Sequence, residues 1–308
     1  MLDILLGVQQ ARRCITPESM DIIARQVGLT RIAVEGVASF YSFLSSAPKG
    51  RVTIRLCDDI IDRYAGLEAV TAAFEKELGV KVGETSADGE FSLEFTPCIG
   101  MCDQAPAAMI NELVATNLTA ESATRIASAL KQGVSPKDAL VKGFDALTPY
   151  DRLKAQVENN IRLSGEVLLG AVPEDAGLLA AKKLDPSAII DMVEASGLRG
   201  CGGAGFTTGR KWRMAAAAPS ERRFIICNAD EGEPGTFKDR VLLTERANLV
   251  FEGMTIAARA VGAQSGIFYL RGEYAYLRNY LETVLAERRA KELLGAAILG
   301  DKGYDFDI

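Results

Sequence analysis

Residues 197–212 read GLRGCGGAGFTTGRKW, a glycine-rich run to which the other elements in the second half of the chain can be related. Five glycines between Gly200 and Gly209 leave backbone N–H groups unshielded and free to adopt positive φ, as a loop must to approach a phosphate or a flat ring closely. Lys211 follows and supplies a flexible positive charge where a phosphate could lie. A glycine-rich loop alone is equally typical of an ordinary turn, so the interpretation depends on a second motif.

That second motif reads CNADEGEPGT and occupies residues 227–236. It follows a compact apolar run at residues 224–226, which predicts a buried strand. The carboxyl end of a strand is where open α/β sheets bind their ligands. Asp230, Glu231 and Glu233 would repel one another and a phosphate there unless they face hydroxyls, ring N–H groups or a ribose. Together the two motifs indicate a pocket for a flavin and a nicotinamide nucleotide.

Composition and charge exclude several classes of protein. The 308 residues suffice for two domains, and 48% hydrophobic with 25% charged residues is ordinary for a globular protein. A net charge of −6 without a lysine- or arginine-rich block argues against a nucleic-acid partner. No apolar run approaches the roughly 20 residues that span a bilayer, and no signal peptide is recognisable, so we expect a cytoplasmic protein without direct membrane insertion.

Histidine is absent from the chain. Its absence excludes Ser-His and Cys-His catalysis and makes a zinc enzyme improbable, because those chemistries depend on imidazole as base or ligand. Hydride transfer to a flavin has no such requirement, since the cofactor carries out the chemistry and the protein positions it.

The first part of the chain predicts a helical bundle followed by a small α/β domain. Thr16, before Pro17, and Thr30 are N-caps of helices whose apolar faces would pack together over residues 1–46. The elements expected next, in chain order, are a strand at 52–57, a helix at 67–78, a strand at 91–95, an apolar segment at 107–114 and a helix from Thr119 to about Gly133. This order is thioredoxin-like.

The cysteines at the ends of these strands carry the chemistry of the first half. Cys57 ends one strand, and Cys98 and Cys102 share a tight loop after another. Thiols in a protein without a secretion signal are more often metal ligands or redox groups than disulfides. Cys14 and Cys227 are interpreted as small core residues.

The second half alternates strands and helices. Residues 134–165 are polar, contain prolines and predict an interdomain linker. A helix capped by Asp185 and stopped by Gly197 leads into the glycine motif. The elements after it are a strand at 224–228, a helix at 240–260, a strand at 266–271 and a helix at 274–290. This alternation predicts a parallel, Rossmann-like sheet.

The two motifs, with YLRGEY at residues 269–274, resemble the FMN- and NADH-binding subunit of respiratory complex I. The residues ahead of them resemble the thioredoxin-like ferredoxin subunit of the same system. Fusion of both in one chain most resembles the diaphorase flavoprotein subunit of NAD-reducing nickel-iron hydrogenases. The resemblance implies an α/β chain with a helical bundle at 1–46, a thioredoxin-like 2Fe-2S domain at 47–133, a linker at 134–165 and an FMN- and NAD(H)-binding domain at 166–308.

The resemblance also implies individual roles. The loop residues whose backbone would approach the cofactors are Gly200, Gly202, Gly203 and Ala204. Phe206 would stack near the nucleotide, Lys211 would bind the FMN phosphate, and Glu233 would face the incoming NADH. The residues expected at the flavin's ribityl chain or ring edge are Asn228, Asp230 and Glu231. Where the family usually has arginine this chain has Cys201, which removes a cation from the loop.

Related ferredoxin domains hold a 2Fe-2S cluster with cysteines spaced C-x4-C and C-x3-C. Cys57, Cys98 and Cys102 match three of these positions, and the fourth is Asp62. Such a cluster normally has four thiolate ligands. A carboxylate from Asp62, or from neighbouring Asp58 or Asp59, could complete the site; alternatively, the domain has lost its cluster and serves as a docking scaffold.

By resemblance, the function is hydride exchange between NAD(H) and FMN, with single electrons passed to iron–sulfur centres of partner diaphorase and hydrogenase subunits. The alternatives are the corresponding subunit of complex I or of an NAD-dependent formate dehydrogenase, or a non-catalytic assembly module. In the family the sheet continues into further loops, a β-grasp domain and a 4Fe-4S bundle that do not follow Ile308, so we expect the flavin domain to be incomplete at its C-terminus.

Overall fold

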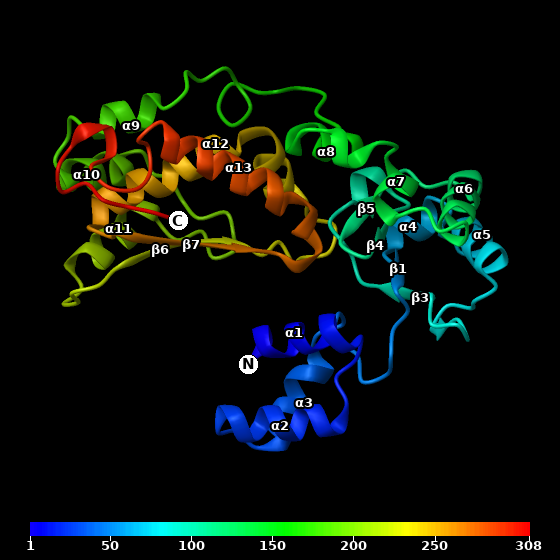
Figure 1. The fold of residues 1–308 in the computed structure, drawn as a ribbon. Helices are drawn as coiled ribbons and strands as arrows, with labels where there is room; N and C mark the ends of the chain where they lie inside the picture. Colours follow the sequence, from blue (N-terminus) through cyan, green and yellow to red (C-terminus); the bar gives the residue numbers. More distant parts are fainter. The chain divides into compact units, whose positions relative to one another are not determined.

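The computed structural model describes residues 1–308 and divides into two compact units (Figure 1). The first unit comprises Met1–Glu158 together with the short segment Glu233–Thr236, and the second comprises Asn159–Gly232 and Phe237–Ile308. The expected α/β fold class is confirmed: the first unit has a helical bundle and a five-stranded sheet with helices, and in the second unit helices alternate with two strands. No helix is long and apolar enough to cross a membrane.

The first unit begins with the three expected helices, α1 (Leu2–Arg12), α2 (Pro17–Val27) and α3 (Arg31–Phe40). The predicted caps are confirmed: Thr16 Oγ1 accepts a hydrogen bond from Ser19 N at 3.2 Å, and Thr30 caps α3 in the same way. The helices enclose a small core that includes Leu5, Ile15 and Val34. Packing of this core explains why the helical periodicity was visible in the sequence.

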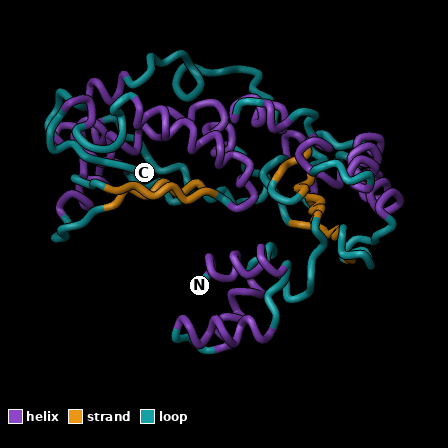
Figure 2. The backbone as a smooth tube through the Cα atoms, in the orientation of Figure 1, coloured by secondary structure: helices purple, strands orange, loops and turns teal.

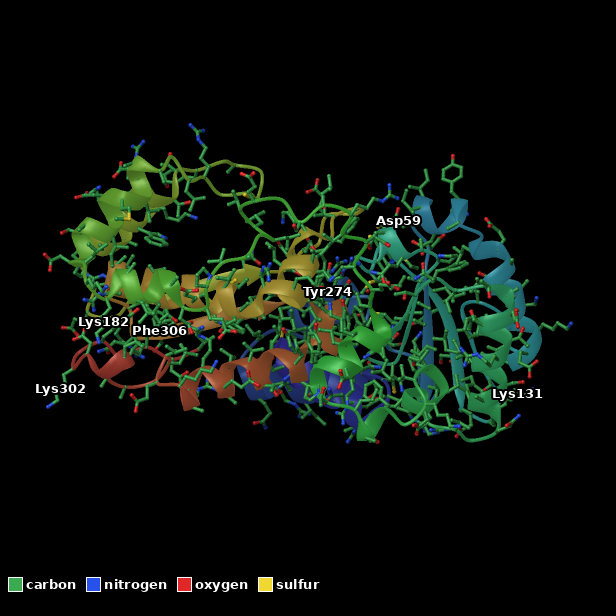
Figure 3. All side chains as sticks on the ribbon, turned by 90° about the horizontal axis from the view of Figure 1, so that it is seen from above. Asp59, Lys131, Lys182, Tyr274, Lys302 and Phe306 are labelled. Atoms are coloured by element: carbon green, nitrogen blue, oxygen red, sulfur yellow. The ribbon has the colours of Figure 1, made fainter.

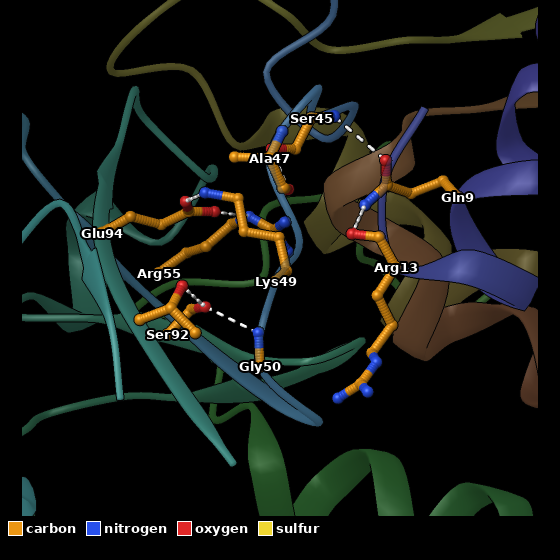
Figure 4. Close-up of polar contacts among 10 residues, drawn as sticks. Gln9, Arg13, Ser45, Ala47, Lys49, Gly50, Arg55, Ser92 and Glu94 are labelled. Atoms are coloured by element: carbon orange, nitrogen blue, oxygen red, sulfur yellow. Dashed lines mark hydrogen bonds and ion pairs between the residues drawn. The ribbon is translucent and has the colours of Figure 1, made fainter. Parts of the chain in front are cut away.

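Polar contacts tie the turn after the bundle to the following sheet (Figure 4). Ser45 N donates to Gln9 Oε1 at 3.0 Å on the bundle side, and Gly50 N donates to Ser92 Oγ at 2.7 Å on the sheet side. A Cβ at Gly50 would lie 2.6 Å from the carbonyl carbon of Phe91, so only glycine permits this approach of the two backbones.

The thioredoxin-like sheet has five strands in the order β2-β3-β1-β4-β5. The central strand β1 (Val52–Cys57) pairs in parallel with β3 (Phe91–Thr96) and antiparallel with β4 (Ala108–Ile110). The remaining strands are β2 (Glu84–Thr85) and β5 (Leu113–Ala115). The apolar segment expected at 107–114 is therefore a tight hairpin, in which Asn111 takes a positive φ of 55°.

Helices α4 (Ile60–Tyr64), α5 (Leu67–Leu78) and α6 (Ala120–Lys131) complete this domain. Its core combines the apolar faces of α5 and α6 with β1, β3 and β4. Residues 134–165, expected as a polar linker, contain α7 (Pro136–Leu140), the 3-10 helix η2 (Phe144–Ala146) and α8 (Pro149–Gln156). Serine and threonine caps before prolines start α7 and α8.

In the second unit, β6 (Phe224–Ala229) and β7 (Ser265–Leu270) form a two-stranded parallel sheet (Figure 2). The long helix α12 (Lys238–Val261) packs against both strands and ends at Gly262, as predicted. The other helices that pack in this unit are α9 (Ala176–Ala181), α10 (Pro186–Ala195), α11 (Thr208–Ala217) and α13 (Arg278–Ala290).

Two expectations for this unit were wrong. The strand at 224–228 is not buried, because Phe224 and Ile226 are 47% and 63% exposed. A sheet of two strands with α12 on one face leaves its other face open. The helix expected at 274–290 begins instead as a 3-10 helix, η3 (Gly272–Leu277), before α13.

Candidate functional site

The glycine loop, residues 198–208, is shaped by its own backbone. Gly200 N donates to Phe206 O and Thr208 N donates to Leu198 O, both at 2.9 Å, so the chain doubles back on itself. Gly203 has φ 93° in the intervening turn, a conformation that a residue with a Cβ seldom adopts. An added Cβ at Gly203 would meet nothing within 4 Å, so this backbone is open to a ligand. Phe206 is 43% exposed at the edge of the loop.

The loop leads into α11, whose first turn carries Lys211. The Lys211 side chain is exposed, as required of a cation that reaches a phosphate. Gly209 lies in the same turn and serves the packing of two helices, because a Cβ there would lie 2.4 Å from Glu194 N of α10. Gly209 therefore allows α10 and α11 to pack closely, whereas the glycines before it leave backbone exposed.

The carboxyl end of β6 presents polar groups to solvent. Asn228 and Asp230 are exposed, and Asn228 Oδ1 accepts a hydrogen bond from Asp230 N at 3.1 Å. Glu233 is also exposed, in the segment Glu233–Thr236 that groups with the first unit. These side chains are free to bind hydroxyls or N–H groups of a ligand.

Glu231 differs from its neighbours because it is buried, with only 4% of its surface exposed. Its Oε1 accepts a hydrogen bond from Asp239 N at 2.7 Å, and its Oε2 accepts one from Arg240 N at 3.2 Å. Both donors lie in the first turn of α12, where a helix has unpaired N–H groups and a partial positive charge. The carboxylate therefore caps α12 from a position seven residues before the helix begins.

Tyr274 binds the same carboxylate, and Arg271 binds the backbone of the same residue. Tyr274, labelled in Figure 3, donates its hydroxyl to Glu231 Oε2 at 2.8 Å. Burial, and then the charge of Glu231, raise the pKa of Tyr274, so this hydroxyl remains a donor at neutral pH. Arg271 donates a hydrogen bond to the Glu231 carbonyl oxygen. The sequence reasoning missed this network, although YLRGEY contains both partners.

In the first unit the three predicted cysteine ligands converge. Cys57 ends β1 opposite Thr96, which ends β3, and Cys98 follows two residues later. The Sγ atoms of Cys98 and Cys102 are 3.3 Å apart. Hydrogen bonds from the thiols of Cys102 and Cys57 lower the pKa of Cys98, so the middle sulfur of the three is the preferred thiolate.

Two carboxylates adjoin these sulfurs. Asp59, at the start of α4 (Figure 3), has Oδ2 3.6 Å from Cys102 Sγ. Asp62 is 1% exposed, and its Oδ1 accepts a hydrogen bond from Ala107 N at 2.8 Å. Burial raises the pKa of both carboxyl groups. Sulfur donors at and after the strand ends, with oxygen donors at the start of α4, form a set that suits an iron–sulfur or tetrahedral metal site.

Two family models match this chain, one in each half. Residues 1–131 match the model of the thioredoxin-like [2Fe-2S] ferredoxin, and residues 193–304 match that of the Nuo51 FMN-binding domain. The two matches lie in different parts of the chain, and each agrees with the resemblance that the sequence motifs indicated.

Individual relatives match the whole chain or a part of it. The chain is 44% identical, over its full length, to 51% of the NAD-reducing hydrogenase HoxS subunit alpha of Cupriavidus necator. Over 44% of its length it is 46% identical to a subunit of the NADH-quinone oxidoreductase of Aquifex aeolicus, covering 32% of that protein. A crystal structure of an NAD+-reducing [NiFe]-hydrogenase in the H2-reduced state matches with a TM-score of 0.77 and 35% identity, over 94% of this chain and 48% of that one.

The chain is therefore homologous to the alpha subunit of an NAD-reducing hydrogenase and, over 44% of its length, to a subunit of NADH-quinone oxidoreductases. It spans about half the length of the hydrogenase subunit that it matches.

Proposed function

We propose that this chain binds FMN and NAD(H), supports hydride exchange between them, and passes electrons on to iron–sulfur centres. The observation that carries the proposal is the open glycine loop followed by an exposed lysine, in a chain homologous throughout to a hydrogenase subunit named for NAD reduction. When bound, FMN accepts hydride and releases electrons singly, which is chemistry that protein side chains do not supply.

The chain's own residues bind and orient. The loop backbone at Gly200, Gly202, Gly203 and Ala204 would approach the cofactors, with Phe206 stacking beside the nucleotide. Lys211 would hold the FMN phosphate, Asn228 and Asp230 would accept hydrogen bonds from the flavin, and Glu233 would contact NADH. Both carboxylate oxygens of Glu231 are engaged in capping α12, so its contribution in this proposal is to hold the loop that carries Asp230.

The proposal also includes partner proteins and a location. The partners would be hydrogenase and diaphorase subunits with iron–sulfur clusters, in the cytoplasm. A 4Fe-4S centre would belong to the part of the relatives that this chain does not match. The cluster expected in this chain itself is the 2Fe-2S centre of its thioredoxin-like domain.

Binding of FMN to the purified chain tests the proposal, with quenching of flavin fluorescence as the readout. Lys211→Ala removes a charge-assisted hydrogen bond of about 1.5–3 kcal/mol, so the dissociation constant should rise about 10- to 100-fold. Lys302→Ala is the matched control, because it removes another exposed lysine of the same unit. Equal affinities for wild type and Lys211→Ala would contradict the role of Lys211, and absence of FMN binding by the wild type would refute the function.

A further inference from the structure

The cysteine site contains a carboxylate oxygen that the rest of the protein leaves unsatisfied. Asp62 lies in α4 with 1% of its surface exposed. Its Oδ1 is engaged by Ala107 N at 2.8 Å, whereas Oδ2 is buried and has no well-formed hydrogen bond, although the Cys57 thiol interacts with the carboxylate. A buried carboxylate oxygen without a partner is costly and requires an explanation.

The neighbouring carboxylates have other partners, although Asp58 Oδ1 is, like Asp62 Oδ2, buried without a well-formed hydrogen bond. Asp58 pairs with Arg63 at 2.7 Å at the surface. Asp59 accepts a hydrogen bond from Ile60 N at 2.6 Å through Oδ1, while its Oδ2 faces Cys102 and the residue remains partly open to solvent. Water can satisfy Asp59 whatever the state of the thiols, so neither residue needs a metal to account for its position.

The two sides of the site also differ in composition. Cys98 and Cys102 have adjacent sulfurs on one loop, and Cys57 interacts with Asp62 on the other side. A 2Fe-2S cluster takes two protein ligands on each iron, and non-thiolate ligands are known to replace thiolates on one of the two. Cys57 also contacts Cys98, and Asp59 lies close enough to Cys98 and Cys102 to share a metal ion with them, so the three thiols have one carboxylate on each side.

We infer that Asp62, through Oδ2, is the fourth ligand of a 2Fe-2S cluster, on the same iron as Cys57, while Cys98 and Cys102 hold the other iron. The inference rests on the iron–sulfur part of the proposed function and replaces the alternative of a docking scaffold without a cluster. It also assigns Asp59 to the surroundings of the cluster and not to its ligands. A tetrahedral zinc ion could accept the same three sulfurs and one oxygen, so the test must separate zinc from an iron–sulfur cluster.

The test uses the full chain, reconstituted anaerobically with iron and sulfide, and measures metals, acid-labile sulfide and the electron paramagnetic resonance spectrum after reduction with dithionite. The wild type should hold about two irons and two sulfides per chain. Asp62→Asn retains an oxygen that can accept from Ala107 N but replaces the ligand atom, so iron content should fall at least about fivefold. Asp59→Asn is the matched control and should keep both the iron content and the g values.

Asp62→Cys keeps the test decisive even if Asp62→Asn fails to fold. It supplies a fourth thiolate, so the variant should retain two irons while its g values shift away from those of the wild type. Identical spectra for wild type and Asp62→Cys would overturn the inference. Wild-type chain that contains zinc without sulfide, or no iron, would overturn it too. So would loss of iron in Asp59→Asn but not in Asp62→Asn. Chain that binds FMN but no iron would refute this inference and leave the flavin function intact.

Discussion

Replacing Glu231 by glutamine should destabilise the second unit, because this buried carboxylate caps α12. The substitution removes the negative charge at the N-terminus of α12. The interaction of such a charge with the helix dipole stabilises the fold by about 1 kcal/mol in a buried position. The substitution also places an amide NH2 group against two backbone donors, so that either Asp239 N or Arg240 N, which the carboxylate now binds at 2.7 and 3.2 Å, loses its acceptor. An unsatisfied buried N–H costs about 2 kcal/mol.

The sum of about 3 kcal/mol corresponds to a fall in Tm of about 6–12 °C for a unit of this size. Thermal denaturation followed by circular dichroism measures the fall in Tm. Hydrogen exchange shows whether the loss of stability lies in the first turn of α12, where the amides of Asp239 and Arg240 should exchange faster. Tyr274→Phe removes one further hydrogen bond to the same carboxylate and should cost about 1 kcal/mol.

Glu221→Gln is the control, because it neutralises an exposed carboxylate and should change stability by less than about 0.5 kcal/mol. The double variant of Glu231→Gln with Tyr274→Phe should fall short of additivity, since the two residues share one contact. If Glu231→Gln leaves the Tm unchanged but abolishes FMN binding, the carboxylate binds the flavin directly and the capping argument is wrong.

Two further predictions concern ligand binding and thiol reactivity. Glu233→Gln should raise the Michaelis constant for NADH about 10- to 100-fold, because one charged hydrogen bond to the nucleotide is lost. Ferricyanide reduction by the FMN-loaded chain measures this constant, and the FMN content should not change. Loss of FMN with unaltered NADH kinetics would contradict the role of Glu233. Burial, and then the charge of Asp239, raise the pKa of Cys227 to about 11. Only about a thousandth of this thiol is thiolate at pH 8, so iodoacetamide should label exposed Cys201 at least 100-fold faster. The labelling rate at Cys227 should rise about tenfold per pH unit until near pH 11. Comparable rates for the two cysteines at pH 8, measured by mass spectrometry, would contradict the raised pKa of Cys227.

Local signals in the sequence predicted most of the elements correctly. Threonine before proline specified α2, and glycine after an apolar face ended α5 and α12, because caps depend on neighbouring residues alone. The 107–114 segment was not resolved into two strands, since its turn depends on a non-glycine residue, Asn111, at positive φ. The exposure of β6 could not be predicted either, because it depends on how many strands and helices cover the sheet.

In the candidate sites, too, some features could be predicted from the sequence and others depended on contacts between distant residues. The spacing of cysteines along the chain was sufficient to select Cys57, Cys98 and Cys102, because strand ends and the loop after them bring these residues together. The spacing also placed Asp62 at the fourth position, but it left Asp58 and Asp59 open as alternatives, since the partners of each carboxylate depend on the three-dimensional structure. The cap formed by Glu231 escaped notice for a similar reason: its partner Tyr274 lies 43 positions further along the chain.

The open face of the β6–β7 sheet affects how the protein behaves in solution. Ile226, Ile267 and Tyr269 are each about half exposed or more, and β6 has no strand on its outer edge. An uncovered apolar face beside a free row of backbone donors and acceptors is the usual starting point for aggregation. Colloidal stability of the isolated chain should therefore be limited at this sheet, and charged substitutions on this face should improve solubility without disturbing the pairing of the two strands.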